Sequence, residues 1–432
     1  NEMSKEKRAL VAIAKEPEIQ ASVTKVFDLM GGVTNMIEKG STVVLKPNAG
    51  HAAPAESAVC TNPETLRAVI HEVRKAQPRS IVVAESAAVG CDTMECYQLS
   101  GIAKVCEEEN VEMIDIKKDK DLVNVAVRGY KSNIKHAKIP RFLLEADHII
   151  NLPILKAHAS MVFSCALKNI KGTVQDAVHV TMHQQNLTMA MMDVWYAVRP
   201  DINIVDAINV ASGFSPHTPT PLHVGVIMGS YDPVALDMIA CDVVGIDTDK
   251  VSYFEAAEEA ELGICDRARI DVVGEKVENV YKKMWIPYIG GMDKWPEYDI
   301  RCQGACSSCQ AMLALNMETL KAIGAYDENS DKTIVIGGRN TIPEDKPKDK
   351  IILHGNCTRK FADKGLWIPG CPPGEVALYM TILEGKVMDG EGDMVEKIIR
   401  PRMEHDHPAW EAYVREQAKK FYGDDFFEKN NE

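Results

Sequence analysis

The sequence predicts an α/β protein: a mostly parallel sheet covered by helices, followed by a second, smaller α/β domain that is rich in cysteine. Three observations support this fold class. Short β-branched runs alternate with helix-like segments through the first two-thirds of the chain, as in a parallel sheet. These runs are almost continuously apolar, which is typical of strands that helices cover on both faces. Five of the 12 cysteines fall in one stretch that is rich in glycine and proline.

Strands and helices of the first domain are marked by local signals. Thr61-Asn62-Pro63-Glu64 offers a capping residue, a proline and an early acid at the start of a helix, and Asp232-Pro233 repeats this start. In sheets of this class, ligands bind at the carboxyl ends of the strands, so the residues that follow each strand are candidates for a site. The predicted strands are Ala9–Ala14, Thr42–Lys46, Ile81–Glu85, Val111–Ile116, His148–Leu152, Ile202–Asp206 and His223–Gly229.

A change of composition to tryptophan, proline and glycine between Tyr281 and Tyr298 indicates a domain boundary. We therefore expect an α/β domain over residues 1–284, a cysteine-rich α/β domain over residues 285–390 and a helical tail over residues 391–432. The expected elements of the second domain are a helix over Ala311–Ile323 and strands over Thr333–Ile336 and Lys350–Leu353; in the tail, Trp410, Tyr413 and Phe421 are available for packing.

Composition and charge restrict the class of partner. Hydrophobic residues make up 46% of the chain and charged residues 26%, which is ordinary for a globular protein. The formal net charge of −14 repels a phosphate backbone and disfavours nucleic acid as a partner. No apolar run approaches the ~18 residues that a membrane span needs. The N-terminal segment lacks the apolar core of a signal peptide, so we expect a cytoplasmic protein, although a start at Asn1 leaves room for a trimmed export signal.

The clustered cysteines predict a metal site. Cys302-x3-Cys306-x2-Cys309 is followed by Cys357 and by Cys371 in a Pro-Gly-Cys-Pro-Pro loop. In a reducing compartment such spacing favours metal binding over disulfides. Thiolates from closely spaced backbone and from distant loops suit a [4Fe–4S] cluster. The first three cysteines with Cys371 or Cys357 would supply four ligands, and one cysteine would be spare.

Two alternatives remain open for this stretch, namely a structural zinc site and a group of thiols without a metal. The x3-x2 spacing also matches the motif of radical S-adenosylmethionine enzymes, but it lies beyond the main domain and no barrel pattern follows it. The remaining seven cysteines lie in apolar or helical text, where a buried free thiol is expected; they are Cys60, Cys91, Cys96, Cys106, Cys165, Cys241 and Cys265.

Basic and amide residues gather at the predicted strand ends and should meet at one sheet edge. Their ammonium groups would bind a carboxylate or a phosphate, and crowding lowers the pKa of a lysine toward base or Schiff-base chemistry. We expect His158, Lys168 and Lys156 to be catalytic, with His158 transferring protons because its ordinary pKa lies near neutrality. The expected substrate-binding residues are Lys46, Asn48, Glu85, Asn169 and Lys171.

The alternative for these residues is a solvated charged rim. His179 and His183 are four residues apart and would share a helix face. Without a third ligand or an adjacent glutamate this spacing is a weak metal signal, and partial burial is the more ordinary interpretation.

Five motifs in order between residues 8 and 275 resemble the domain of unknown function 362 family. The resemblance implies an iron–sulfur protein, since members commonly bind clusters, often through a ferredoxin-like insert; this chain has no run of x2-spaced cysteines and carries its own C-terminal group instead. The motifs are Lys46-Pro47-Asn48, Asn62-Pro63-Glu64, Asn151-Leu152-Pro153-x-x-Lys156-x-His158, Ala166-Leu167-Lys168-Asn169 with Gly172, and Ser230-x-Asp232-Pro233-Val234-Ala235-x-Asp237.

Two shorter resemblances concern single loops. The Pro-Gly-Cys-Pro-Pro loop at Cys371 is similar to a cluster-binding loop of hydrogenase small subunits. The spacing His158-x9-Lys168 is similar to that of the catalytic histidine and the cofactor-bearing lysine of nickel-pincer lactate racemases, but the residues before Lys168 differ from that family's paired glycines. This second likeness implies where a pocket would lie.

The expected function is an iron–sulfur redox or electron-transfer protein, in which the first domain holds a small anionic substrate or cofactor and the second supplies electrons from a [4Fe–4S] cluster. One alternative is a cofactor-dependent isomerase or racemase with a lysine-anchored cofactor and a structural cluster. Another is a non-enzymatic cluster carrier. The expected partners are a small anionic molecule and an electron-donor protein, and a homodimer is left open.

Overall fold

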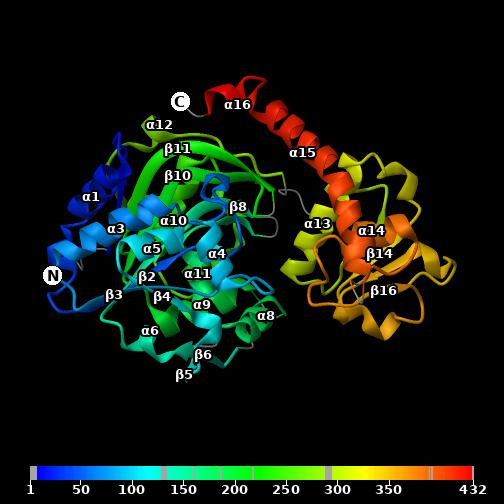
Figure 1. Ribbon diagram of the computed structural model, residues 1–432, viewed down its shortest axis with the longest axis horizontal. Helices are drawn as coiled ribbons and strands as arrows, with labels where there is room; N and C mark the ends of the chain where they lie inside the picture. The colour runs from blue at the N-terminus through cyan, green and yellow to red at the C-terminus, as the bar shows by residue number, and fades with distance from the viewer. Residues whose placement is uncertain are drawn as a thin grey trace, which may run out of the picture. The chain divides into compact units, whose positions relative to one another are not determined.

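The computed structural model consists of two units, one formed by Asn1–Ile286 with Asn430–Glu432 and the other by Pro287–Lys429 (Figure 1). It describes residues 7–127, 134–158, 161–184, 187–216, 218–287, 294–388, 390 and 393–430. Each unit combines helices with its own sheet. Within the described residues, no helix has both the length and the apolar character required to cross a membrane.

The first unit is built on a ten-stranded sheet with the strand order β12-β1-β11-β10-β7-β2-β3-β4, and β8 joins β10 to β9. Neighbouring strands pair in parallel except at β1–β11, β10–β11 and β8–β9. The mostly parallel sheet predicted from the sequence is therefore confirmed. The strands are β1 Ala9–Ala14, β2 Thr42–Pro47, β3 Ser80–Glu85, β4 Glu112–Asp115, β7 His148–Leu152, β8 Ile154–His158, β9 Val162–Ser164, β10 Ile202–Phe214, β11 Thr218–Ser230 and β12 Ile270–Gly274.

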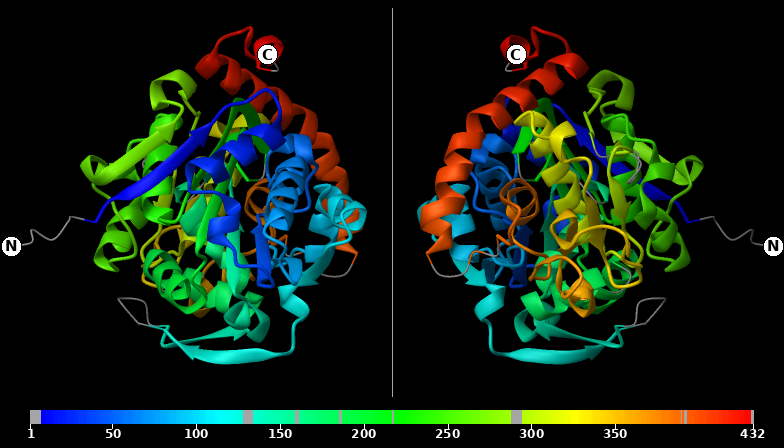
Figure 2. Two further views of the ribbon diagram at one scale, coloured as in Figure 1. Left: turned by 90° about the vertical axis from the view of Figure 1, so that its left-hand side faces the viewer. Right: turned by 90° about the vertical axis from the view of Figure 1, so that its right-hand side faces the viewer.

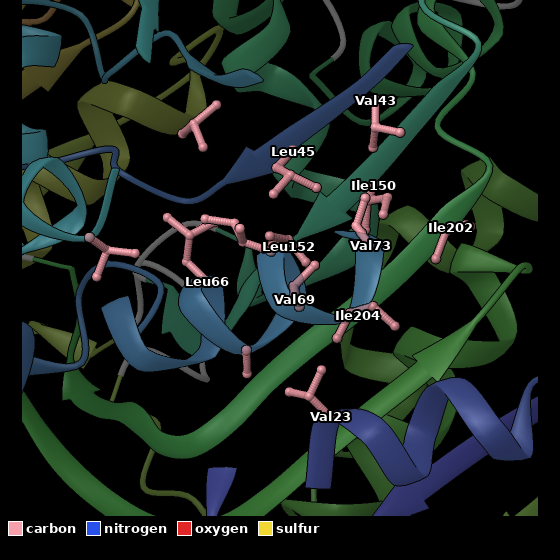
Figure 3. Close-up of a cluster of buried hydrophobic side chains, with 14 of the residues drawn as sticks. Val23, Val43, Leu45, Leu66, Val69, Val73, Ile150, Leu152, Ile202 and Ile204 are labelled. Atoms are coloured by element: carbon pink, nitrogen blue, oxygen red, sulfur yellow. The ribbon is translucent and has the colours of Figure 1, made fainter. Parts of the chain in front are cut away.

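Helices cover both faces of this sheet. Figure 3 shows one face, where Val43 and Leu45 of β2 and Ile150 of β7 lie among apolar side chains from α1 and α3. Asn62 caps α3 through its side chain, and Asp232 caps α10 in the same way, as their sequences predicted. The helices of the unit are α1 Ile19–Leu29, α2 Val33–Met36, α3 Pro63–Lys75, α4 Thr93–Leu99, α5 Ile102–Glu108, α6 Arg141–Glu145, α7 Ala166–Asn169, α8 Asp176–Gln184, α9 Leu187–Val198, α10 Pro233–Val243, α11 Ser252–Glu259 and α12 Val277–Val280.

Two features of the first unit differ from the sequence prediction. The predicted strands Ile202–Asp206 and His223–Gly229 are the inner parts of β10 and β11, which pair with each other over most of their length. The segment up to His158 continues as strand β8, because it pairs with β10 on one side and with β9 on the other. A separate antiparallel pair, β5 Leu122–Ala126 and β6 His136–Pro140, lies apart from the main sheet of its unit (Figure 2).

The second unit has a four-stranded sheet, all parallel, in the order β13-β14-β15-β16. Its core contains Leu313 and Met317 of α13, which begins at Ser307, earlier than the sequence predicted. In α15, Trp410 is buried and the Tyr413 hydroxyl donates to Glu318 Oε2 at 2.6 Å. The elements are β13 Asp299–Arg301, β14 Thr333–Ile336, β15 Ile351–His354, β16 Leu366–Ile368, α13 Ser307–Ala322, α14 Ala377–Glu384, α15 Arg400–Tyr422 and α16 Phe426–Lys429.

Candidate functional site

The predicted lysine, histidine and amide residues of the first unit lie at the carboxyl ends of neighbouring strands. Lys46 is in β2 and Glu85 ends β3, while Lys156 is in β8. The chain then passes through β9 into the one-turn helix α7, which carries Lys168 and Asn169, and into a 3-10 turn at Ile170–Thr173. Parallel neighbours end at the same sheet edge, so these residues are brought together although they are far apart in sequence.

Lys46 and Glu85 form a buried ion pair at this edge. Lys46 Nζ lies 2.8 Å from Glu85 Oε2, and both side chains are almost fully removed from solvent. Nζ also donates to the Pro47 carbonyl at 2.9 Å and to Asn169 Oδ1 at 3.2 Å, so its three protons are all used. Burial lowers the pKa of Lys46 and raises the pKa of Glu85, while their mutual attraction opposes both shifts. The pair holds the strand ends together.

Gly172 makes room for this pair. A Cβ at Gly172 would lie 1.7 Å from Glu85 Oε1 and 2.5 Å from Lys46 Nζ, so no larger residue fits there. Its carbonyl accepts a hydrogen bond from Ser86 N at 2.9 Å. The glycine noted in the sequence motif is therefore required by a close approach of backbone to buried charges.

An amide network links this pair to a second lysine. Asn48 donates from Nδ2 to Asn169 Oδ1 at 2.9 Å, and Asn48 Oδ1 accepts from Lys156 Nζ at 2.9 Å. Asn169 Nδ2 donates in turn to Asn151 Oδ1 at 2.8 Å. Lys156 is buried, and this burial lowers its pKa to about 8. Asn151 and Asn169 are buried and Asn48 is partly buried, and this network keeps the lysine in one position.

Asp237 of α10 positions the helix that carries Lys168. Its two carboxylate oxygens accept from Ala166 N at 2.8 Å and from Leu167 N at 2.9 Å. The Trp195 indole donates to the Leu167 carbonyl at 2.8 Å and holds the same turn. Burial raises the pKa of Asp237 to about 7. Asp237 belongs to one of the sequence motifs, but the sequence assigns it no role. The backbone groups that it binds, at Ala166 and Leu167, lie about 70 residues away in the chain.

A group of bases completes the edge. His158, Lys168, Lys171 and His183 are each partly exposed, so a solute can reach them. Lys171 Nζ lies 2.6 Å from His183 Nε2. Lys168 Nζ makes no hydrogen bond or ion pair within the described part of the chain. We call the set Lys156, His158, Lys168, Lys171 and His183 the basic cluster.

The pKa of every member of the basic cluster is lowered from its ordinary value. Burial, followed by the charges of Lys168, Lys171 and Lys156, moves the pKa of His158 well below its ordinary value. Burial also moves the pKa of Lys168 well below the usual range and that of Lys171 to about 8. Each group would regain protons if a negative charge were brought among them. The arrangement is thus chemically suited to bind an anion.

The histidine pair on α8 serves this cluster. His179 Nε2 contacts the Lys171 carbonyl, and burial lowers the pKa of His179 to about 3. Burial, followed by the charge of Lys171, also lowers the pKa of His183. The spacing of four residues therefore places both rings against Lys171, a relationship that the sequence pattern could not identify.

In the second unit, four thiols come from the loops that follow three strands of its parallel sheet. Cys306 and Cys309 lie between β13 and the first turn of α13, Cys357 follows β15, and Cys371 follows β16. Cys309 has electrostatic interactions with Cys306, Cys371 and Cys357. Hydrogen bonds from the Cys309 thiol and from backbone N–H groups at the start of α13 lower the pKa of Cys306. We call these four residues the thiol group.

Backbone contacts fix the loops that carry the thiol group. Asn356 N donates to the Gly370 carbonyl at 2.9 Å, and Gly370 N donates to Asn356 Oδ1 at 2.9 Å. A Cβ at Gly355 would lie 3.5 Å from Cys309 Sγ. Cys357 is exposed, Cys309 is buried, and all 12 cysteines are free thiols.

Cys302, the fifth predicted ligand, is partly buried and packs against the apolar core of the second unit. In the described residues, no group of three or more histidine, cysteine, aspartate or glutamate side chains is arranged to hold a metal ion.

Parts of the chain are similar to known proteins. A thylakoid-associated protein of Synechocystis sp. is 26% identical over 253 residues, which cover 56% of this chain and 75% of that protein. The lactate racemase apoprotein of Thermoanaerobacterium thermosaccharolyticum is 15% identical with a TM-score of 0.36, over 54% of this chain and 56% of the racemase, so the match spans little more than half of that enzyme. A protein of Thermotoga maritima is 14% identical with a TM-score of 0.33, over 82% of this chain and 96% of that structure.

The family match falls on the first unit. The basic cluster, the Lys46–Glu85 pair and the amide network all lie in this match, whereas the thiol group lies outside it. Residues 43–242 match the family described as "Domain of unknown function (DUF362)".

Proposed function

We propose that this protein is an iron–sulfur redox protein whose second unit holds a [4Fe–4S] cluster and whose first unit binds a small anionic substrate. The observation that carries the proposal is the thiol group: Cys306, Cys309, Cys357 and Cys371 come from three loops at the carboxyl end of one parallel sheet. Ligands bind at this end of such sheets.

The residues around the thiol group fit such a cluster. Glycines lie next to two of these cysteines: a Cβ at Gly355 would be 3.5 Å from Cys309 Sγ, and one at Gly338 would be 3.9 Å from Cys357 Cβ. Thiolates are the ligands that iron–sulfur clusters use. When bound, such a cluster supplies one-electron transfer.

A structural zinc ion is the alternative metal, since it also takes four thiolates. The thiols of Cys306 and Cys309 are in hydrogen-bond contact, and Cys371 and Cys357 act on Cys309 electrostatically. Metal analysis of the purified protein distinguishes iron from zinc.

The first unit supplies the substrate site in this proposal. Lys156, Lys168 and Lys171 bind the anion by charge, since their ammonium groups gain stability only when a negative group lies among them. His158 holds or moves a proton at the bound substrate, because its imidazole stays neutral near pH 7. Lys46 and Glu85 serve as the framework, as the three protons of Lys46 are already bonded within the protein.

Anaerobic purification with iron, sulfide and zinc analysis tests the cluster. We expect about four irons and four sulfides per chain, with visible absorption that dithionite bleaches. Cys371→Ser and Cys357→Ser should lose most of the iron, whereas Cys302→Ser should keep it, which makes Cys302 a matched control within the same stretch. Stoichiometric zinc without visible absorption would refute the redox proposal. Loss of iron in Cys302→Ser but not in Cys357→Ser would refute the ligand set.

A second function is favoured by one observation at Lys168. Its amine has no hydrogen bond or ion pair among the described residues and stands beside Lys171 and Lys156, so it is available to form a covalent bond to a cofactor. In that case the protein is an isomerase or racemase with a lysine-anchored cofactor. The intact mass of protein from native cells distinguishes the two functions: an adduct lost in Lys168→Arg supports the second, and an unmodified mass supports the first.

A further inference from the structure

The loops after β2 and β3 bring together a histidine and a cysteine that the proposed site does not use. Cys91 Sγ lies 3.8 Å from His51 Nδ1, and both side chains are partly exposed. The two loops are tied by a hydrogen bond from Ala88 N to the Gly50 carbonyl at 2.9 Å. Nucleophile–base pairs are often this loosely spaced before a substrate binds.

A nearby ammonium group strengthens the case for Cys91. Lys117 Nζ donates to the carbonyls of Ala88 and Cys91, both at 2.8 Å, and pairs with Asp176 at 2.9 Å. This lysine fixes the backbone of the loop that carries the cysteine. Imidazole and ammonium neighbours are the surroundings that favour a thiolate.

The neighbouring cysteines lack these surroundings. The buried Cys60 thiol donates to the His51 carbonyl at 3.2 Å, and burial raises the pKa of Cys60 to about 11. Cys96 is also buried, and its pKa is raised to about 12. Both therefore stay protonated, which singles out Cys91 as the nucleophile of the group.

The pair adjoins the basic cluster through a short path. Lys156 Nζ donates to the Val59 carbonyl at 3.0 Å, and the next residue, Cys60, holds the backbone of His51. The charge of Lys156 also acts on the Cys60 thiol. Lys156 of the basic cluster therefore lies close, along these contacts, to the loop that carries His51.

We propose that Cys91 and His51 form a nucleophile–base pair, and that the substrate is a small acid with an electrophilic carbonyl carbon. This substrate class rests on the anion site proposed above. His51 takes the proton of the Cys91 thiol, the sulfur forms a bond to the carbonyl carbon, and the π pair of the carbonyl moves to its oxygen. That oxygen then takes the proton from His51. The product is a reversible hemithioacetal or hemithioketal, with no leaving group and no change in oxidation state.

Alkylation of the full-length holoprotein tests the pair. In each reaction the cysteine sulfur displaces iodide from the carbon of the reagent, and because the thiolate is the nucleophile, the rate reports how readily the thiol loses its proton. Rates with neutral iodoacetamide and with anionic iodoacetate are measured at each cysteine by peptide mapping. Cys265 is an internal control: it is also partly exposed, but its thiol donates to the Phe254 carbonyl at 3.6 Å, and Glu258 and Asp232 lie near it.

We expect Cys91 to react about tenfold faster with iodoacetamide than free glutathione does under the same conditions, whereas Cys265, whose pKa burial raises to about 11, should react more slowly than both. His51→Gln and His51→Ala should both remove this advantage. Cys91 should also prefer iodoacetate, and inorganic phosphate should slow that reaction at Cys91 but not at Cys265. A Cys91 rate equal to that of Cys265, or unaffected in both His51 variants, would overturn the pair.

The remaining outcomes separate this inference from the proposed function. The alkylation rate of Cys91 can depend on His51 without Cys91 reacting faster with iodoacetate and without phosphate slowing that reaction. In that case the proposed substrate class is wrong. Calorimetric titration with phosphate then shows whether the anion site itself has failed. Iron and sulfide analysis of the same preparation reports on the cluster independently of both.

Discussion

The ammonium group of Lys46 lies 2.8 Å from Glu85 Oε2 at the meeting point of β2 and β3, with both side chains almost completely buried. Two charges without solvent are tolerated there because each is matched by the other and by further hydrogen bonds, including one from Ala49 N to Glu85 at 3.0 Å.

Removing one member of this pair should be costly, because the other charge is left buried and uncompensated. We expect Lys46→Met and Glu85→Leu each to lower the free energy of unfolding by about 3–5 kcal/mol, and the double variant to lose much less than the sum. Urea denaturation measures this. The exposed pair Arg8–Asp271 is the control, and Arg8→Gln should cost about 0–1 kcal/mol. Additive losses in the double variant would contradict the coupling.

Gly172→Ala should disrupt the same pair from the other side. The new methyl group would overlap Glu85 Oε1, so either the ion pair or the turn that carries Lys171 must move. We expect a loss of about 1–3 kcal/mol or more in unfolding free energy, as in overpacked cores, together with weakened phosphate binding. Gly50→Ala is the matched control, because its Cβ would have 3.8 Å to the nearest atom, Asn48 Oδ1. Equal behaviour of the two variants would show that the close approach is unimportant.

Asp237 should show a pH-dependent contribution to stability. Its pKa is raised from 3.8 to about 7 in the folded protein, so between these values the unfolded chain releases a proton that the folded chain keeps. The contribution of Asp237 is therefore present below pH ~4 and lost as pH rises to ~7. Relative to the Asp237→Asn variant, the wild-type protein should become less stable as the pH rises from ~4 to ~7. Above pH ~7 the difference in stability should not change further. Thermal denaturation between pH 4 and 8 measures the difference.

Asp237→Ala tests the role of this carboxylate in positioning α7. Two buried N–H groups, at Ala166 and Leu167, would lose their acceptor, at a cost of about 1–3 kcal/mol each at most. Because the same turn carries Lys168, anion affinity should fall as well. Retained affinity with reduced stability would separate a purely structural role from a positioning one.

Anion binding to the basic cluster should consume protons. Burial holds the pKa of Lys156 and of Lys171 near 8, and a bound phosphate or sulfate would raise both. Affinity should therefore fall as pH rises above ~8, and binding at pH 8 should be accompanied by proton uptake. Calorimetry in two buffers of different ionisation enthalpy measures that uptake, which Lys171→Gln should reduce. An affinity independent of pH between 7 and 9 would argue against the lysines as ligands.

The order of strands and helices was predictable because it depends on local pattern. Apolar runs of strand length and capped helix starts are encoded within about ten residues, and β2, β3, β7, α3 and α10 lie where these signals indicate. The extensions of β10 and β11 were missed. The outer part of β11 contains Pro219 and Pro221, and proline is more typical of a loop than of a strand. This segment is extended because it pairs with β10.

The amino-acid sequence alone determined which chemistry the chain can offer: soft thiols in its last third, and amines with an imidazole at strand ends in its first half. It also determined the parallel sheet that gathers strand ends at one edge. Tertiary structure alone decided how those groups are divided: Lys46 forms a buried pair with Glu85, and Lys168 has no hydrogen bond or ion pair among the described residues. The physical reason is that burial and hydrogen bonding depend on neighbours from distant segments, and these set the pKa and the availability of each side chain.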